Sequence, residues 1–201
     1  MYDLRRKHFP VLPTSLDNAL QQLRILKSDK CFTYKNQQFI YAPADANFIC
    51  LTTVQNINFL TQFCSELFCD GTFDYSLKYF LQLYMIHSYK NGFYLPLVYF
   101  FLKDKTQNTY VDLWNYFRQL CTKINNKILD IKIIHLDFEI SAHKAVLFVF
   151  PEVKIMACRF HLGQSWWGKI QSESGLREAY MDSNDELGKW LKQFFALPFL
   201  A

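Results

Sequence analysis

The sequence predicts an α/β protein built on a mixed five-stranded sheet flanked by helices. The first observation is a hairpin signal, because two long β-rich runs, Tyr79–Tyr89 and Phe93–Leu102, flank Lys90-Asn91-Gly92. Asn-Gly favours such a turn, since both residues tolerate a positive φ. The second is that apolar strands and amphipathic helices alternate after the hairpin, which is the order of βα units. The third is a content of 20 Phe and 12 Tyr, which favours a bulky, sheet-rich interior.

Length and composition indicate a globular chain. Its 201 residues suffice for one domain with a core, or for one domain and part of another. Apolar residues make up 51% of the chain, which excludes the composition of a disordered segment. No apolar run has the length of a membrane span, and the first residues lack the apolar stretch of a signal peptide. We therefore expect an intracellular protein without a membrane partner.

Charge and cysteine content are less informative. The net charge of +4 would favour an anionic partner but is too small to indicate nucleic-acid binding. The six cysteines have no repeated short spacing, and most fall in predicted strands or helices, so we expect buried reduced thiols without a disulfide framework. They are Cys31, Cys50, Cys64, Cys69, Cys121 and Cys158.

The sequence divides into a mixed N-terminal segment over 1–49, a core over 50–162, and C-terminal helices over 163–201. In the first part, Ser15 or Asp17 caps a predicted helix over Asn18–Lys27. A strand pair is predicted within Phe32–Tyr41, around Lys35-Asn36. No function is predicted for this segment.

Helices of the core are predicted from apolar residues at three- and four-residue spacing, and strands from short β-branched or aromatic runs. Ser141 is the expected N-cap of one helix, Pro151 ends it, and Gly175 weakens a later one. The elements beside the hairpin strands are a helix over Asn56–Leu67, a strand from Leu67 to Cys69, a helix over Tyr110–Ile124, a strand over Ile131–Leu136, a helix over Ser141–Phe150, a strand over Val153–Ala157, and helices over Leu162–Tyr180 and Leu187–Phe195.

Two aspartates are predicted at strand ends. Asp70 follows Leu67–Cys69, and Asp137 follows Ile131–Leu136. An Asp that ends an apolar strand is costly unless it holds a cation or accepts several hydrogen bonds. Two such carboxylates at neighbouring strand ends are half of a two-metal phosphoryl-transfer site. The simpler interpretations are that Asp70 is a turn residue before Gly71 and that Asp137 leads into a helix.

The order of three hairpin-linked strands followed by βα repeats is that of a ribonuclease-H-like fold. The first and fourth strands of that fold are central neighbours, so Asp70 and Asp137 would lie side by side. Chemistry in open α/β sheets occurs at the carboxyl ends of such strands. The adjacency favours the metal-binding interpretation of both aspartates over the two simpler ones.

Other polar residues are interpreted more cautiously. Glu139 is expected in the first turn of a helix, where it complements the helix dipole. Cys158-Arg159-Phe160-His161 is half of a zinc site at most, because a structural zinc needs four ligands. We expect Cys158 and His161 at the edge of the active site. Trp166-Trp167 is compatible with stacking on bases and with a helical core face.

Several motifs, in order, resemble the catalytic domain of Mutator-like element (MULE) transposases. They cover roughly residues 50–195 and are Leu67-Phe68-Cys69-Asp70-Gly71-Thr72-Phe73, Gln82–His87, Leu95–Tyr99, Asp137-Phe138-Glu139, Phe150-Pro151, Cys158–Gln171, Gly175-Leu176 and Tyr180. The resemblance implies a ribonuclease-H-like core that cuts and rejoins DNA with three acidic residues and Mg²⁺ or Mn²⁺. Asp70 and Asp137 match the first two catalytic and metal-binding acids, and Cys158 and His161 match the Cys-x-x-His signature.

The resemblance also implies DNA at transposon ends as the partner and a nuclear location, and it allows a homo-oligomer. In the family a helical insertion follows the Cys-x-x-His helix, and the catalytic glutamate lies beyond it. We therefore expect this chain to be a fragment that ends as the insertion starts, with Glu173, Glu178 and Glu186 as weak candidates for the third acid.

Two other functions are weighed beside a transposase. A catalytically inactive, transposon-derived DNA- or protein-binding module would explain the missing third acid. A 3′–5′ exonuclease is disfavoured, because such enzymes carry Asp-x-Glu on the first strand, whereas Gly71-Thr72 follow Asp70 here.

Overall fold

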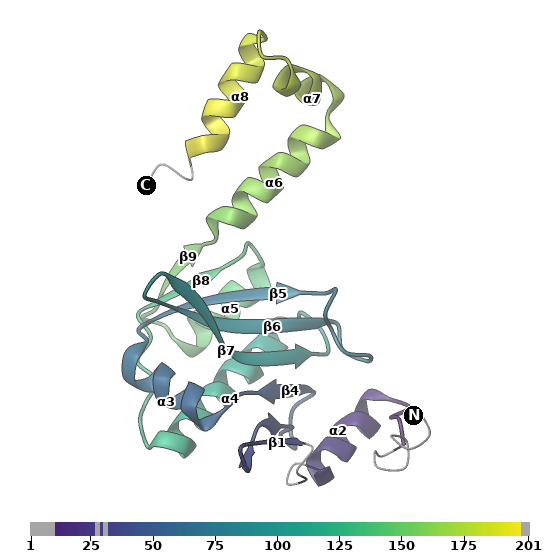
Figure 1. Ribbon diagram of the computed structural model, residues 1–201, viewed down its shortest axis with the longest axis vertical. Coiled ribbons are helices and arrows are strands. Elements are labelled where there is room, and N and C mark those ends of the chain that lie inside the picture. Colours follow the sequence, from purple (N-terminus) through teal and green to yellow (C-terminus); the bar gives the residue numbers. More distant parts are fainter. Residues whose placement is uncertain (1–10, 27–28, 30–31, 198–201) are drawn as a thin grey trace. The chain divides into compact units, whose positions relative to one another are not determined.

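The computed structural model describes residues 11–26, 29 and 32–197 and has an α/β architecture (Figure 1). Its seven-stranded mixed sheet has the order β3-β4-β7-β6-β5-β8-β9. The strands are β3 (Ile40–Tyr41), β4 (Phe48–Leu51), β5 (Glu66–Thr72), β6 (Gln82–Lys90), β7 (Phe93–Leu102), β8 (Ile133–Leu136) and β9 (Lys154–Ala157), and a separate hairpin pairs β1 (Thr33–Tyr34) with β2 (Gln37–Gln38).

Strands β5, β6 and β7 form an antiparallel meander, and β8 pairs with β5 in parallel. Two bonds join β9 to β8, from Lys154 N–H to Lys132 C=O and from Cys158 N–H to Leu136 C=O. Both ends of these bonds advance by four residues in the same direction, so β9 runs parallel to β8. Strands β5, β7 and β8 therefore have their carboxyl ends at the same edge of the sheet.

The prediction of five strands was wrong, because β3 and β4 extend the sheet beyond β7. Phe48–Leu51 is an apolar run that pairs antiparallel with Tyr99–Leu102. Phe48 and Cys50 point to the helix-covered face and are buried. The predicted hairpin is confirmed: Asn91 has φ 52° and Gly92 has φ 86° between β6 and β7.

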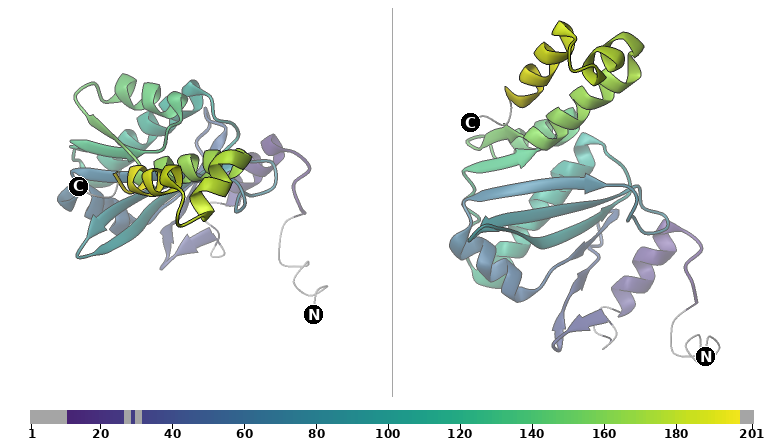
Figure 2. Two further views of the ribbon diagram at one scale, coloured as in Figure 1. Left: turned by 90° about the horizontal axis from the view of Figure 1, so that it is seen from above. Right: turned by 45° about the horizontal axis from the view of Figure 1, so that its top comes forward.

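The helices are α2 (Leu16–Leu26), α3 (Val54–Phe63), α4 (Gln107–Asn125), α5 (Ile140–Val149), α6 (Arg159–Ser172), α7 (Ser174–Met181) and α8 (Glu186–Ala196). Helices α4 and α5 pack together behind the sheet in Figure 1, and Figure 2 shows them on one side of it. Helix α4 contributes the fully buried Tyr110, Trp114 and Phe117 to this core. On the other face, Leu20 of α2 packs with Ile49 and Phe101.

The N-terminal predictions are largely confirmed. Ser15, and not Asp17, caps α2, since its Oγ accepts the Asn18 N–H at 3.1 Å. Lys27 lies outside the described residues. The strand pair around Lys35-Asn36 is β1–β2, and both turn residues have positive φ. No helix in the described part of the chain combines the length and the apolar character needed to cross a membrane.

Three predicted helix boundaries were wrong. Helix α3 ends at Phe63, because Leu67 is recruited into β5, where it is fully buried. The N-cap of α5 is Glu139, and Ser141 lies inside the helix. The predicted helix over Leu162–Tyr180 is two helices, which meet at Glu173 in an extended conformation (φ −106°, ψ 112°), and Gly175 is helical.

The chain consists of two compact units. The first ends at His135 and continues from Glu139 to Ile155, and the second comprises Leu136–Phe138 and the chain from Met156 onward. The second unit has an aromatic core of its own. Trp166 stacks on Phe194 with ring centroids 4.7 Å apart, and Trp167 meets Tyr180 at 5.1 Å. Both tryptophans therefore pack between helices, which favours the core interpretation of this pair.

Helices α7 and α8 approach closely at Gly188, which is buried. A Cβ atom there would overlap the carbonyl of Ala179, whereas a Cβ at Gly168 in α6 would have nothing within 4 Å. We expect Gly188→Ala to destabilise the second unit by about 1–3 kcal/mol through overpacking. Gly168→Ala should instead stabilise it by about 0.5–1 kcal/mol through helix propensity. Urea unfolding followed by tryptophan fluorescence measures both, and equal effects of the two variants would contradict the close approach.

Candidate functional site

The pairing of β5 with β8 fixes the register of the candidate site. Glu66, Leu67 and Phe68 pair in parallel with Ile133, Ile134 and His135, respectively. The rings of Phe68 and His135 stack with centroids 4.1 Å apart and planes 10° apart. Nε2 of His135 lies 2.6 Å from Oε1 of Glu66. Main-chain pairing, ring stacking and a side-chain hydrogen bond thus hold these two strands in one register.

Each predicted aspartate lies two residues after a member of the Phe68–His135 pair. Asp70 is two residues after Phe68, and Asp137 is two residues after His135. In a strand, residues two apart are on the same face. Asp70 therefore shares the face of Phe68, opposite the face on which Leu67 and Cys69 are buried. This is the face that α4 and α5 leave uncovered.

The sequence predicted Asp70 at the end of a strand, but Asp70 lies within β5. The strand continues to Thr72, and half-buried Asp70 pairs with Met85 of β6. The turn interpretation of Asp-Gly is wrong, because Gly71 also pairs in the sheet, with Tyr84. Space is tight at Gly71: a Cβ would lie 2.7 Å from Oε1 of buried Gln82, so that side chain would have to shift. Nε2 of Gln82 donates to the hydroxyl of Tyr110 at 2.6 Å.

His87 is the neighbour of Asp70 that the sequence analysis did not predict. It pairs with Phe68 across β5 and β6 and is half-buried. Burial lowers the pKa of His87, while a hydrogen bond with the Phe68 backbone and the negative charge of Asp70 oppose this shift. The imidazole is thus biased toward its neutral form beside a carboxylate.

Asp137 is half-buried and follows the last residue of β8. The N-cap of the next helix is Glu139, so Asp137 lies two residues before the cap, in the segment that leads into α5. The Glu139 side chain makes no capping hydrogen bond. Oε2 of Glu139, at the N-terminus of α5, lies 3.5 Å from Nζ of Lys105.

Lys105 is presented by a rigid turn between β7 and α4. Oδ1 of Asp104 accepts the Thr106 N–H at 3.0 Å, the Thr106 hydroxyl at 2.8 Å and the Thr109 hydroxyl at 2.6 Å. Burial alone would raise the pKa of Asp104, but these hydrogen bonds outweigh it and lower that pKa. Nζ of Lys105 also lies 4.6 Å from the ring centroid of Phe73, just beyond β5.

Cys158 and His161 lie at the start of α6, where Cys158 occupies the N-cap position. Both side chains are half-buried. Across residues 11–26, 29 and 32–197, no three His, Cys, Asp or Glu side chains gather as candidate metal ligands. The five described cysteines are all reduced, and Cys31 lies outside the described residues. Burial raises the pKa of Cys50, and that of Cys121 to about 12, as expected for inert thiols.

The three weak candidates for a third acid are exposed. Oε1 of Glu173 accepts from Nζ of Lys169 at 2.7 Å, and this hydrogen bond and the lysine charge lower the Glu173 pKa. Glu186 pairs with Lys189 at 2.7 Å, and Glu178 lies on α7. Each of these positions is that of an ordinary surface glutamate.

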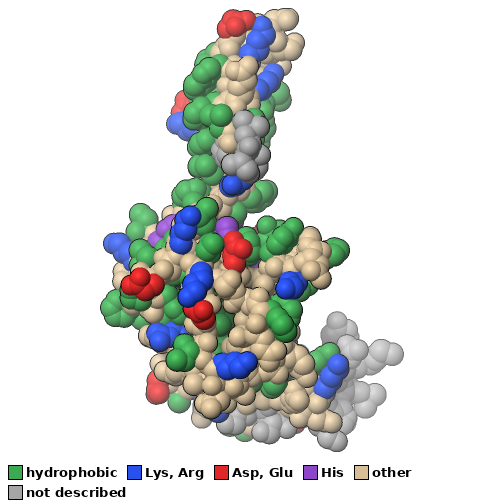
Figure 3. Space-filling view, turned by 90° about the vertical axis from the view of Figure 1, so that its left-hand side faces the viewer, with side chains coloured by type: hydrophobic (Ala, Val, Ile, Leu, Met, Phe, Trp, Pro, Cys, Tyr) green, Lys and Arg blue, Asp and Glu red, His purple; other side chains and the backbone are tan. Residues whose placement is uncertain are grey.

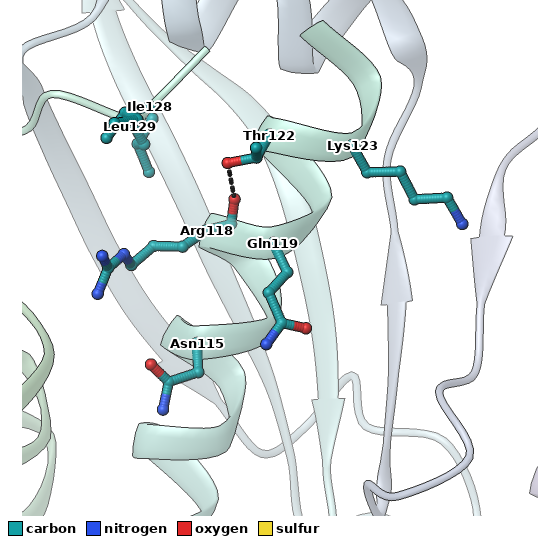
Figure 4. Close-up of a pocket in the computed structure, with 7 residues that line it drawn as sticks. All are labelled: Asn115, Arg118, Gln119, Thr122, Lys123, Ile128 and Leu129. Atoms are coloured by element: carbon teal, nitrogen blue, oxygen red, sulfur yellow. Dashed lines mark hydrogen bonds between the residues drawn. The ribbon is translucent and has the colours of Figure 1, made fainter. Parts of the chain in front are cut away.

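A hollow of about 580 Å³ lies elsewhere, along α4 (Figure 4). It is lined by Asn115, Arg118, Gln119, Thr122 and Lys123 of this helix and by Ile128 and Leu129 after it. The Thr122 hydroxyl donates to the Arg118 carbonyl at 3.1 Å in this view. None of the predicted site residues lines it. Figure 3 shows the first unit from the left-hand side of Figure 1, and on this face Lys and Arg side chains are interspersed with acidic and hydrophobic ones, without a continuous basic stripe.

Comparison with known proteins assigns the family. Residues 67–165 match the family model described as the MULE transposase domain. This match, which runs from β5 into α6, supports a MULE transposase-related protein, as the motifs predicted. It includes Asp70, Asp137, Cys158 and His161. No curated protein matches the chain.

We expect Gly71→Ala to destabilise the protein by about 1–2 kcal/mol. The new methyl group must displace Gln82 and break its bond to Tyr110, and both partners are buried. Urea denaturation gives the free energy of unfolding. In the background of Gln82→Ala the same substitution should cost much less, because the overlapping amide is gone. An equal cost in both backgrounds would contradict the proposed clash.

The turn that carries Lys105 should be sensitive to pH. Asp104→Ala should cost about 1 kcal/mol at neutral pH, since three donors lose their acceptor at a partly exposed site. A carboxyl whose pKa is lowered by folding stabilises the protein above its ordinary pKa, and that stabilisation is lost as the pH falls through the folded-state value. The difference between wild type and variant should therefore shrink between pH 6 and pH 3. Denaturant titrations at the two pH values test this, and a constant difference would contradict it.

Proposed function

We propose that this chain carries the ribonuclease-H-like catalytic core of a DDE-type transposase, which cleaves DNA and transfers strands with Mg²⁺ or Mn²⁺. The strand order supports this fold: the meander β5-β6-β7 is followed by parallel β8 and β9, in the order β7-β6-β5-β8-β9 within the larger sheet. The family match over residues 67–165 supports the transposase assignment.

The register of β5 and β8 is the observation on which the proposal depends. Phe68 pairs with His135, and Asp70 and Asp137 follow these two residues at the same distance along the chain. We infer that these two carboxylates bind the same divalent cations. Mg²⁺ in phosphoryl-transfer sites is held by one or two carboxylates together with water and substrate phosphates. The donor set of Asp70 and Asp137 therefore fits a Mg²⁺ or Mn²⁺ site.

The residues have distinct roles in this proposal. Asp70 and Asp137 hold the cations, which, when bound, activate the attacking oxygen and stabilise the leaving one. His87 is biased toward its neutral form, so it adds no full positive charge that would compete with a cation at Asp70. Cys158 and His161 lie at the edge of the site, as the resemblance implies. In the family the third acid lies beyond a helical insertion, so we assign that role to none of Glu173, Glu178 and Glu186.

DNA at transposon ends is the proposed substrate, and the nucleus is the proposed location. A second candidate function is an inactive DNA- or protein-binding module. It is favoured by one observation, namely that no group of three or more His, Cys, Asp or Glu side chains that could hold a metal ion occurs within the described residues. A measurement of metal binding separately from catalysis distinguishes the two functions.

We expect Asp70→Asn and Asp137→Asn each to lower Mg²⁺-dependent cleavage of transposon-end DNA by roughly a thousandfold, because several kcal/mol of charge stabilisation is lost. In the wild type, Mn²⁺ should broaden the NMR signals of residues near Asp70, and either variant should abolish this. Asp130→Asn is the matched control, since Asp130 is exposed and pairs with Lys132 just before β8. Mn²⁺ broadening without cleavage would favour the inactive module, and cleavage unaffected by Asp137→Asn would refute the proposal.

A further inference from the structure

Residues that follow three parallel strands contact one another at the carboxyl edge of the sheet. Phe73 follows β5, Lys105 follows β7, and Glu139 follows β8. Nζ of Lys105 lies 4.6 Å from the ring centroid of Phe73 and 3.5 Å from Oε2 of Glu139. Phe73 is three residues after Asp70, and Glu139 is two after Asp137. Within the first unit, Lys105 is thus a cation between the residue that follows β5 and the N-cap of α5.

The contacts of Lys105 leave its ammonium group able to bind another anion. Its separation from Glu139 exceeds the 2.7–2.9 Å typical of a strong charge-assisted hydrogen bond. The Lys105 side chain is 38% exposed and the Glu139 side chain 19%, so water still reaches the lysine end of the pair. Pairs of this kind contribute at most about 1 kcal/mol to stability. The fold therefore gains little from this lysine at its present position.

The turn that carries Lys105 is held by several hydrogen bonds, which this weak ion pair does not require. Three hydrogen bonds to Asp104 fix the backbone on both sides of Lys105, and the Thr106 hydroxyl accepts the Thr109 N–H to cap α4. Lys103 shares the turn but is exposed and lines a small hollow with Asp45 and Asp112. Only one of the two lysines therefore faces the carboxyl edge between β5 and β8.

We propose that Lys105 binds a phosphate of the DNA on which the proposed transposase acts, and that Glu139 balances its charge when DNA is absent. The inference rests on the proposed function, because a phosphodiester must be present at this edge. An ammonium is a compact charge with three donors, which suits a phosphate oxygen. Its positive charge would reduce the repulsion between a polyanion and the carboxylates of Asp70 and Glu139 in the first unit.

The test is DNA binding by the whole chain, measured as fluorescence anisotropy of a labelled transposon-end duplex with Ca²⁺, over a series of salt concentrations. A lysine that contacts a phosphate contributes about one unit to the slope of log affinity against log salt. We expect Lys105→Ala to lower that slope by about one and to raise Kd about fivefold at low salt. Lys105→Arg should restore the slope, and Lys103→Ala, the matched control, should leave it unchanged.

A purely structural role for Lys105 would not change the salt slope, so an unchanged slope in Lys105→Ala refutes the inference. Equal losses in the Lys103 and Lys105 variants would also refute it, since they indicate general surface charge. If the wild type binds DNA with the expected difference between variants but does not cleave it, the inference stands and catalysis fails. If it cleaves DNA with no change of slope in Lys105→Ala, the proposed function stands alone. Absence of any DNA binding refutes both.

Discussion

The parallel pairing of β5 with β8 is the constraint on which the candidate site depends. Main-chain bonds define the register, while the Phe68–His135 stack and the Glu66–His135 hydrogen bond stabilise it on the uncovered face. A slip by one residue would turn every side chain of a strand to the opposite face. It would bury Asp70 among the residues under α4 and α5 and expose Cys69. The burial of Leu67 and Cys69 therefore also determines which way Asp70 points.

The packed core and the candidate site thereby lie on different faces of the same strands. The helix-covered face contains fully buried aromatic and aliphatic side chains, among them Trp114, Phe100 and Ile86. The opposite face carries Asp70, His87 and His135, whose surroundings are polar or half-exposed. Gly71 directly follows Asp70 in β5 and faces the buried side of the sheet. Next to Asp70, it leaves room for the buried bond between Gln82 and Tyr110.

The carboxyl edge concentrates charge because three strands run in the same direction. Loops after β5, β7 and β8 must begin at this edge, so residues distant in the sequence come into contact there. Lys105 meets Phe73 and Glu139 for this reason. The arrangement balances acidic side chains with a lysine on a fixed turn. An edge with this composition is suited to a negatively charged substrate that brings its own counterions.

Local sequence determined the elements and the family. Asn91-Gly92, the apolar periodicity of α4, and the motif order around Asp70, Asp137 and Cys158 were sufficient for the hairpin, most helices and strands, and the MULE assignment. The tertiary structure alone decided the two extra strands, the position of Asp70 inside β5, the break at Glu173 and the contact of Lys105 with Glu139. These features depend on pairing and packing between distant segments. A local pattern of residues does not specify which distant segment will pair with a strand edge or contact a loop.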